Sequence, residues 1–244
     1  MIAFVRDVPT SFAKALCATP AAIDVAEARR QHAAYRAALG VPVTVVAADD
    51  ALPDCCFIED TAVVAGGVAL ITRPGAASRQ REPDAVARVL GEHVEIAHMS
   101  APATLDGGDC MRVGQTIYVG RSARTNEAGI ARLAEVFEPR GLRVVPVDLP
   151  REVLHLKCVC APLGDDRITL VTGVPRFGSF AVVEVPAAES YAANVLAIGS
   201  RVLIADGFPQ TADALARAGF DVVPLATTEF RKADGALTCL SILI

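Results

Sequence analysis

A unit of two short strands, a helix and a third strand recurs along the chain. Glycine turns join the paired strands, as in AVVAGGVALI at 62–71 and DCMRVGQTIYVG at 109–120. One copy cannot bury its apolar face alone, so the copies must pack against one another. Five copies, repeating roughly every 35–50 residues, predict a closed ring around a shared axis. The alternative is an open α/β sheet, which leaves the hairpin at the start of each unit unexplained.

Hydrophobic periodicity predicts where the elements lie. Helices are expected near 21–39, 82–91, 124–137 and 209–218, and outer strands at 41–48, 94–97, 142–147, 181–185 and 221–225. The fifth unit is split, with TCLSILI at the C-terminus pairing with IAFVR at the N-terminus. This pairing would seal the ring. We expect a single domain over 1–244, a pseudo-symmetric five-bladed α/β propeller of repeated ββαβ units.

Composition limits the classes of partner. The chain is 52% hydrophobic, enough for a large core, and its net charge of −5 gives no basic patch for nucleic acid. No apolar run reaches the length of a membrane span, and MIAFVRDVP lacks a signal-peptide layout. We expect a cytoplasmic protein, monomeric or homodimeric, that binds neither nucleic acid nor membrane.

The seven cysteines predict free thiols, because the chain has no secretory signal. Cys158 and Cys160 alternate along an expected strand within 157–173, so both should face one side as small core residues. The chain has no Cys-x-x-Cys pair and no paired histidines, so zinc spacing is missing. Neither a metal nor a cofactor is expected.

The leading ends of the innermost strands open on one face of the expected ring. These ends are Glu59-Asp60, Asp106 to Asp109, His155 to Lys157, Ser190 to Asn194, and Cys239. Four of the five place polar, reactive residues in segments that are otherwise apolar. We therefore expect one site on the axis, where a thiol at the start of the last strand meets an imidazole and several carboxylates.

Cys239 and His155 are the residue types of a nucleophile and its base, and a carboxylate that orients the imidazole completes the set. A lone histidine on a strand is more often a packed core residue, but these neighbours favour a catalytic role for His155. The other histidines, His32, His93 and His98, are interpreted as solvated.

The segment LDGGD at 105–109 holds two of the carboxylates. Its glycines favour a tight turn with Asp106 and Asp109 at the two ends, although a hydrogen-bonded Asx turn would also explain it. Several carboxylates around a thiol suit a planar cation such as guanidinium, which forms bidentate pairs with them. They suit neither a peptide nor an acyl anion. The residues alone predict a cysteine enzyme for a guanidino compound.

Six segments carry a resemblance to a known family. They are LPDCCFIEDTAVV (52–64), ITRPGAASR (71–79), LDGGD (105–109), VGRSARTNEAG (119–129), VLHLK (153–157) and KADGALTCLSILI (232–244). Over nearly its whole length the chain resembles the dimethylarginine dimethylaminohydrolases (dimethylargininases) of the guanidine-modifying pentein superfamily. The resemblance implies a five-bladed α/β propeller, in agreement with the repeats.

By this resemblance Cys239 is the nucleophile, His155 the general acid/base, and Asp106 the carboxylate that orients the imidazole. The implied reaction converts dimethylarginine or monomethylarginine to L-citrulline and dimethylamine or methylamine. The thiolate attacks the guanidinium carbon and forms a covalent thiouronium, which a water activated by His155 then hydrolyses. No cofactor or metal takes part.

The same resemblance implies the substrate contacts. Asp60 and Glu59 correspond to acids around the guanidino group, and Asp54 corresponds to a further polar contact. Arg79 and Arg124 correspond to arginines near the substrate carboxylate, a role that their fork geometry suits.

Two implied contacts concern the rim of the site. Leu16 corresponds to the leucine of a mobile lid. Ala233 corresponds to a residue whose backbone lies near the α-amino group. A methylated arginine is the partner that all these contacts imply.

Two alternatives remain. Arginine deiminases show a His-x-Asp pair whose aspartate binds the second side of an unsubstituted guanidinium, and this chain has Lys157 at that place. The lysine leaves that side free for methyl groups, which favours the dimethylargininase. A non-enzymatic pentein-like binding protein would not need Cys239, His155 and Asp106 together.

Overall fold

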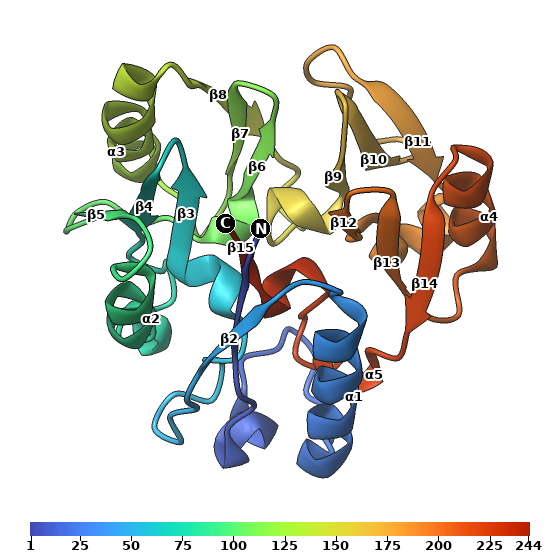
Figure 1. Cartoon of the computed structure of the whole chain (residues 1–244), viewed down its shortest axis with the longest axis horizontal. Coiled ribbons are helices and arrows are strands. Elements are labelled where there is room, and N and C mark those ends of the chain that lie inside the picture. Colours follow the sequence, from blue (N-terminus) through green and yellow to red (C-terminus); the bar gives the residue numbers. More distant parts are fainter.

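The computed structural model describes residues 1–244, and its strands form five three-stranded sheets around a central axis (Figure 1). The sheets consist of β15 (Ile242–Leu243), β1 (Ala3–Arg6) and β2 (Val43–Val46); β3 (Ala62–Ala65), β4 (Val68–Ile71) and β5 (Glu95–His98); β6 (Cys110–Val113), β7 (Thr116–Arg121) and β8 (Arg143–Asp148); β9 (Cys160–Gly164), β10 (Arg167–Val171) and β11 (Ala181–Val185); and β12 (Leu196–Ile198), β13 (Arg201–Ala205) and β14 (Asp221–Leu225). The predicted five-bladed α/β propeller is confirmed.

Every sheet uses the same pairing. The strand nearest the axis pairs antiparallel with the middle strand, which pairs in parallel with the outer strand (Figure 1). A parallel pair needs a long crossover connection, and in four units that connection contains a helix outside the ring. The helices are α1 (Val25–Ala38), α2 (Pro83–Leu90), α3 (Glu127–Phe137), α4 (Pro209–Arg217) and the short α5 (Thr228–Arg231).

The two chain ends complete one sheet, as predicted. β15 pairs antiparallel with β1. The amide of Ile2 donates to the carbonyl of Ile244 at 2.8 Å, and the amide of Ile244 donates back at 3.0 Å. Because the turn that holds Cys239 (Thr238–Leu240) ends one residue before β15, this closure fixes the cysteine beside the axis.

The fourth unit departs from the predicted ββαβ pattern, because no helix joins β10 to β11. The connection, TGVPRFGSF at 172–180, is too short for a helical crossover and contains Pro and two Gly. Its aromatic rings pack on the neighbouring sheet instead. The ring centroids of Phe177 and Phe180 lie 5.6 and 5.0 Å from that of Tyr118.

Capping side chains set the starts of two helices later than the periodicity predicted. The carboxylate of Asp24 accepts from the amides of Ala26 and Glu27, so α1 begins at Val25 rather than near 21. The side chain of Asn126 accepts from the amide of Gly129 and starts α3 at Glu127 rather than near 124. The shorter helices lengthen the loops before them, and both loops reach the site described below.

The inner face of α1 shows that one histidine was misinterpreted. His32 is buried with Ala28 and Tyr35 rather than solvated, and its ring lies 6.3 Å from that of Phe230. Burial, with the nearby charge of Arg36, lowers the pKa of His32 to about 4, so it is neutral at pH 7. None of the helices combines the length and apolar character that a membrane crossing requires.

Candidate active site

The structure brings the five predicted leading ends together on the axis. The ammonium of Lys157 bonds the carboxylate of Glu59, and the amide of Gly108 donates to Asp60 at 2.8 Å. Asn194 accepts from the amide of Thr238 at 2.9 Å, next to Cys239. These contacts join segments far apart in the sequence, so the ring itself builds the site.

A cavity of about 270 Å³ opens at this place. Its walls come from the 16–18 loop, the 54–60 segment, the arginines of two turns, the His155 segment and the C-terminal turn. The residues that line it are Leu16, Cys17, Ala18, Asp54, Phe57, Asp60, Arg79, Arg124, Leu154, His155, Ala233, Asp234, Gly235 and Cys239. Of the ten site residues that the sequence predicted, only Glu59 and Asp106 do not line this cavity.

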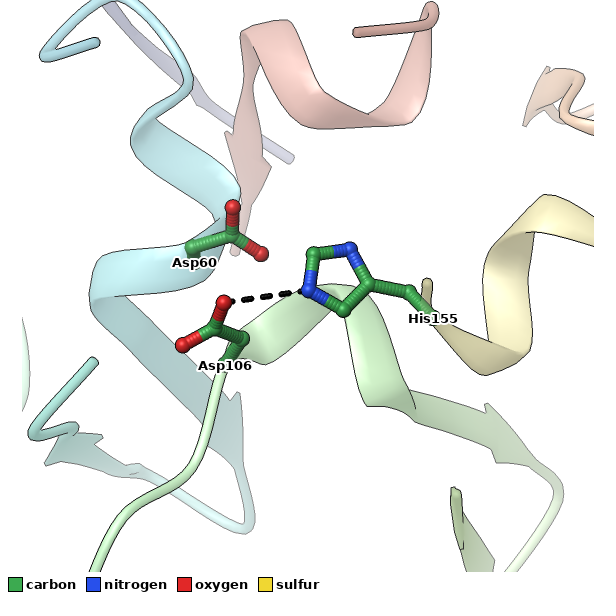
Figure 2. A group of neighbouring side chains, drawn as sticks. All are labelled: Asp60, Asp106 and His155. Atoms are coloured by element: carbon green, nitrogen blue, oxygen red, sulfur yellow. Dashed lines mark hydrogen bonds and ion pairs between the residues drawn. The ribbon is translucent and has the colours of Figure 1, made fainter. Parts of the chain in front are cut away.

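His155 and Asp106 form a buried hydrogen-bonded pair. Nε2 of His155 lies 3.0 Å from Oδ2 of Asp106, and both side chains are almost inaccessible to solvent (Figure 2). This bond turns the other ring nitrogen, Nδ1, away from Asp106. Asp106 therefore occupies the position of an orienting carboxylate, behind the imidazole and not in the cavity.

The two glycines of LDGGD are needed because other groups of the site lie against them, and not because of their backbone conformation. The predicted tight turn is present, since the amide of Asp109 donates to the carbonyl of Asp106 at 3.0 Å. Neither Gly107 nor Gly108 has a positive φ, however, so the turn does not need glycine for its backbone conformation. A Cβ on Gly108 would lie 2.7 Å from Nδ1 of His155 and 2.9 Å from Oδ1 of Asp60. A Cβ on Gly107 would overlap the carbonyl of Glu59. Only glycine lets the imidazole and both acidic segments meet here.

The charges around His155 favour its protonated form. Burial opposes a charged imidazole, but Asp60, the bond to Asp106, and Asp109 outweigh it and raise the pKa of His155 to about 9. Burial likewise opposes ionisation of Asp60, yet His155 and Arg79 lower the pKa of Asp60 to about 2. At pH 7 the cavity therefore presents an imidazolium, which is a proton donor, beside an ionised carboxylate.

Cys239 lies in a 3₁₀ turn, Thr238–Leu240, and not at the start of a strand as predicted. Its amide donates to the carbonyl of Ala236 at 3.2 Å, which closes the turn before β15 begins. Cys158 is also in a 3₁₀ turn, while Cys160 begins β9, so these two cysteines do not alternate on one strand. In both places a 3₁₀ turn comes before the strand that joins the sheet, with Leu156–Cys158 before β9 and Thr238–Leu240 before β15.

Burial and the charges of Glu59 and Asp60 raise the pKa of the Cys239 thiol well above 9. The substrate-free protein should therefore hold a thiol, not a thiolate, at pH 7. Iodoacetamide should alkylate Cys239 slowly at pH 7, with a rate that still climbs through pH 9, since only the thiolate reacts. Peptide mapping after timed quenching measures this rate. A plateau below pH 8 would show a thiolate that is stable without substrate.

Glu59 lies behind the cavity rather than in its wall. Its carboxylate bonds Nζ of Lys157 and accepts from Oγ1 of Thr238 at 2.7 Å. Burial raises the pKa of Glu59, and the lysine opposes that shift. The predicted direct contact of Glu59 with a guanidino group is absent from this arrangement, because the carboxylate of Glu59 is bonded to Lys157 instead. Glu59 instead supports the turn of Cys239 through Thr238.

Arg79 has little hydrogen-bonding capacity left for a substrate. Its NH1 donates to Asp60 at 2.7 Å, its NH2 donates to Phe57 O, and Glu82 takes bonds from Nε and NH2. A guanidinium has five N–H groups, so only one remains free. The predicted fork toward a substrate carboxylate is therefore not available from Arg79, whose main contact orients Asp60.

Arg124 is the guanidinium that remains available in the cavity. Its side chain is 21% exposed, and its NH1 lies 3.6 Å from Asp106, beyond hydrogen-bond distance. That NH1 is buried without a hydrogen-bond partner. An unpaired buried donor is costly, so an anionic group of a ligand would be favourable beside it.

The loop over the cavity is held by two carboxylates. The amide of Leu16 donates to Asp54 at 2.9 Å, and the amide of Ala18 donates to Asp234. The side chain of Leu16 is 40% exposed, as suits a residue at the rim. Ala233 is buried and reaches the cavity from the start of the C-terminal turn.

Sequence reasoning missed several lining residues. Cys17, Phe57, Leu154 and Gly235 were not assigned to the site, although the last three lie inside segments that carry the family resemblance. A Cβ on Gly235 would overlap the ring of Phe57, so this glycine allows the two to pack. Cys17 gave no signal, because a single thiol in a loop has no pattern around it.

Asp60, Asp106 and His155 place ligand atoms within 4.8 Å of one another, a spacing that a metal ion could use (Figure 2). Each group already has protein partners. His155 is bonded to Asp106, while Asp60 is bonded to Arg79 and the amide of Gly108. The positive charge of Arg79 further disfavours a cation at this place.

Comparison with known proteins shows which family the chain resembles. The profile of the arginine deiminase family matches residues 29–190. The chain is 43% identical to N(G),N(G)-dimethylarginine dimethylaminohydrolase of Streptomyces coelicolor over 90% of this chain and 87% of that protein. It is 37% identical to the enzyme of that name from Pseudomonas aeruginosa over 90% and 89%. The solved structure of a cysteine-to-serine mutant of DDAH from Pseudomonas aeruginosa, complexed with citrulline, has a TM-score of 0.95 at 34% identity. It covers 99% of this chain and 98% of that one.

A closed ring of five units with a thiol, an imidazole and carboxylates on its axis defines a pentein of the guanidine-modifying class. Sequence identity of 37–43% over 90% of the chain narrows the class further. The chain belongs to the arginine deiminase family and, within it, to the dimethylarginine dimethylaminohydrolases.

Proposed function

We propose that the protein hydrolyses N-omega,N-omega-dimethyl-L-arginine and monomethylarginine to L-citrulline and the corresponding methylamine. One observation carries the proposal. The thiol of Cys239 and the protonated imidazole of His155 share a 270 Å³ cavity with the carboxylates of Asp54 and Asp60 and with the guanidinium of Arg124, whose NH1 is ion-paired with Asp106 but has no hydrogen-bond partner. The carboxylates suit the cationic end of a methylated arginine, and Arg124 suits its carboxylate end.

Asp60 is the group placed to bind the guanidinium. Its two oxygens each accept one protein hydrogen bond, from Gly108 and from Arg79. An ionised carboxylate has about four acceptor sites, so capacity remains for two N–H groups of a substrate. The low pKa of Asp60 keeps it ionised throughout the neutral range.

The first half-reaction forms a covalent bond to sulfur. The cationic guanidinium offsets the carboxylates that raise the pKa of Cys239, so substrate binding favours the thiolate, and the thiol proton passes to solvent because His155 is already protonated. Its Sγ attacks the guanidinium carbon, and His155 gives a proton to the departing dimethylamine. The product of this step is a thiouronium on Cys239.

The second half-reaction releases citrulline. His155, now neutral, takes one proton from a water that adds to the thiouronium carbon. The hydroxyl so formed gives up the second proton as the C–S bond breaks, and this proton restores the Cys239 thiol. Asp106 holds Nε2 of the imidazole through both halves, so the ring keeps one orientation while its charge changes.

Substrate preference tests the proposal directly. Dimethylarginine should exceed arginine in kcat/KM by at least about tenfold, because arginine would bury N–H groups that find no second carboxylate. Lys157 stands where the deiminases carry that second carboxylate, and its ammonium, which has no acceptor to offer, bonds Glu59. A colorimetric citrulline assay with dimethylarginine, methylarginine and arginine measures the ratios. An equal or higher value for arginine would establish a deiminase.

We also propose that residues 1–244 act as one catalytic domain, as a cytoplasmic monomer or homodimer without a nucleic-acid or membrane partner. The net charge of −5 supports the exclusion of nucleic acid. The cavity is lined by segments from both ends and the middle of the chain, from Leu16 to Cys239, which supports one catalytic unit.

A further inference from the structure

Asp109 is a carboxylate with no accessible surface, and it does not line the cavity. Its Oδ2 lies 2.6 Å from both the hydroxyl of Ser122 and the hydroxyl of Thr125. Its Oδ1 accepts from the amide of Leu156 at 3.0 Å. All three partners are within two residues of a group assigned to the site.

Two backbone amides determine where the hydroxyl hydrogens of Ser122 and Thr125 point. The hydroxyl of Ser122 accepts from the amide of Arg124 at 3.0 Å, and that of Thr125 accepts from the amide of Asp106 at 3.3 Å. Each hydroxyl has a single hydrogen, which then points at Asp109. Two relays and one direct bond therefore bring three donors to Asp109, a pattern that suits the ionised carboxylate. Burial raises the pKa of Asp109, and the charge of His155 and these three bonds oppose that shift.

We propose that Asp109 is a positioning residue, which fixes the backbone of Asp106, Arg124 and the His155–Leu156 pair as one rigid unit. The inference rests on the proposed function for the roles of those residues. One relay holds the residue that orients His155, the second holds the residue suited to the substrate carboxylate, and the direct bond holds the peptide next to the imidazole.

The charge of Asp109 also acts on the imidazole. The charged or titratable groups around His155 are Asp60 and Glu59 in the 58–61 turn, Arg79, Asp106 and Asp109 in the LDGGD segment, Arg124, Lys157, Cys158 and Cys239. Among the groups that raise the pKa of His155, Asp109 follows Asp60 and the bond to Asp106. Removing its charge should therefore lower that pKa from about 9.

The network offers variants that separate its parts. Asp109→Asn keeps the shape, but an amide NH₂ must then face either the two hydroxyls or the Leu156 amide, all of which are donors. Thr125→Val breaks only the relay to Asp106, Thr125→Ser restores it, and Ser122→Ala breaks only the relay to Arg124. Glu189→Gln is the matched control. Glu189 is a buried carboxylate with three similar bonds, from Gln210 and Thr211, outside the cavity.

We expect the variants of the two relays to change different kinetic constants. Thr125→Val should lower kcat about tenfold with little change in KM, while Ser122→Ala should raise KM about tenfold with little change in kcat. Asp109→Asn should do both, and Thr125→Ser should stay within about threefold of wild type. Glu189→Gln should leave both constants unchanged, although its thermal midpoint falls.

A histidine titration tests the inference without turnover. In protein labelled with ¹⁵N-histidine, the His155 signal is assigned by its loss in His155→Gln, and its pKa should fall in Asp109→Asn but not in Glu189→Gln. Absence of citrulline from dimethylarginine with wild-type protein would refute the proposed function alone. An unchanged His155 pKa in Asp109→Asn, or a kcat loss in Glu189→Gln equal to that in Asp109→Asn, would overturn the positioning role.

Discussion

Replacing Cys239 with serine should abolish citrulline formation, with a loss of roughly 10⁴-fold or more in kcat. A serine hydroxyl ionises far less readily than a thiol, and no neutral base stands ready to activate it, because His155 is protonated at pH 7. The variant should still bind dimethylarginine, since the carboxylates and Arg124 remain in the cavity. The citrulline assay and calorimetric titration with substrate measure the two properties.

Three other thiols provide matched controls. Cys17 lines the same cavity, while Cys55 and Cys110 are buried away from it. Their serine variants should retain most of the activity, because none lies in a turn beside His155 and Asp60. Full activity in Cys239→Ser, or loss of activity in Cys17→Ser, would refute the assignment of the nucleophile.

Replacing His155 with glycine should reduce turnover by about two to four orders of magnitude, the usual span for positioned proton transfer. Both half-reactions lose their proton carrier, but not equally. The cationic substrate still favours the thiolate, so attack is partly supported. Hydrolysis has no such help, because water is a poor nucleophile without a base. The variant should therefore stall as the covalent adduct.

Rapid-quench kinetics can separate the two steps. A burst of dimethylamine close to one equivalent, followed by slow citrulline release, is the expected time course for His155→Gly. Added imidazole should accelerate the slow phase if it can occupy the space that the side chain leaves. Near wild-type turnover, or a variant that releases no dimethylamine burst, would contradict the role of His155 in hydrolysis.

The fold could be predicted because few arrangements of five repeated units bury the apolar face of each one. The alternation of AVVA at 62–65 and VALI at 68–71 around two glycines already gives a hairpin, and the split C-terminal unit gives closure. The missing helix between β10 and β11 could not be predicted from the repeat, since its replacement depends on Phe177 and Phe180 finding Tyr118 on another sheet. Such contacts have no local signature.

The sequence predicted most residues of the site, but not which of their side chains face the cavity. The leading strand ends identified Cys239, His155 and Asp106. Which carboxylate faces the cavity depends on ion pairs between units, and Lys157 withdraws Glu59 from it while Arg79 remains bound to Asp60. No spacing in the sequence encodes those pairings.

One measurement tests the central claim most directly, namely the identity of the residue that carries the covalent intermediate. Wild-type protein and His155→Gly would be mixed with dimethylarginine, quenched in acid within the first turnover, digested with trypsin and analysed by mass spectrometry. The mechanism predicts an added mass equal to the substrate less dimethylamine, on the peptide Ala233–Ile244, whose one cysteine is Cys239. An adduct on any other cysteine, or no adduct in a variant that has released dimethylamine, would contradict it.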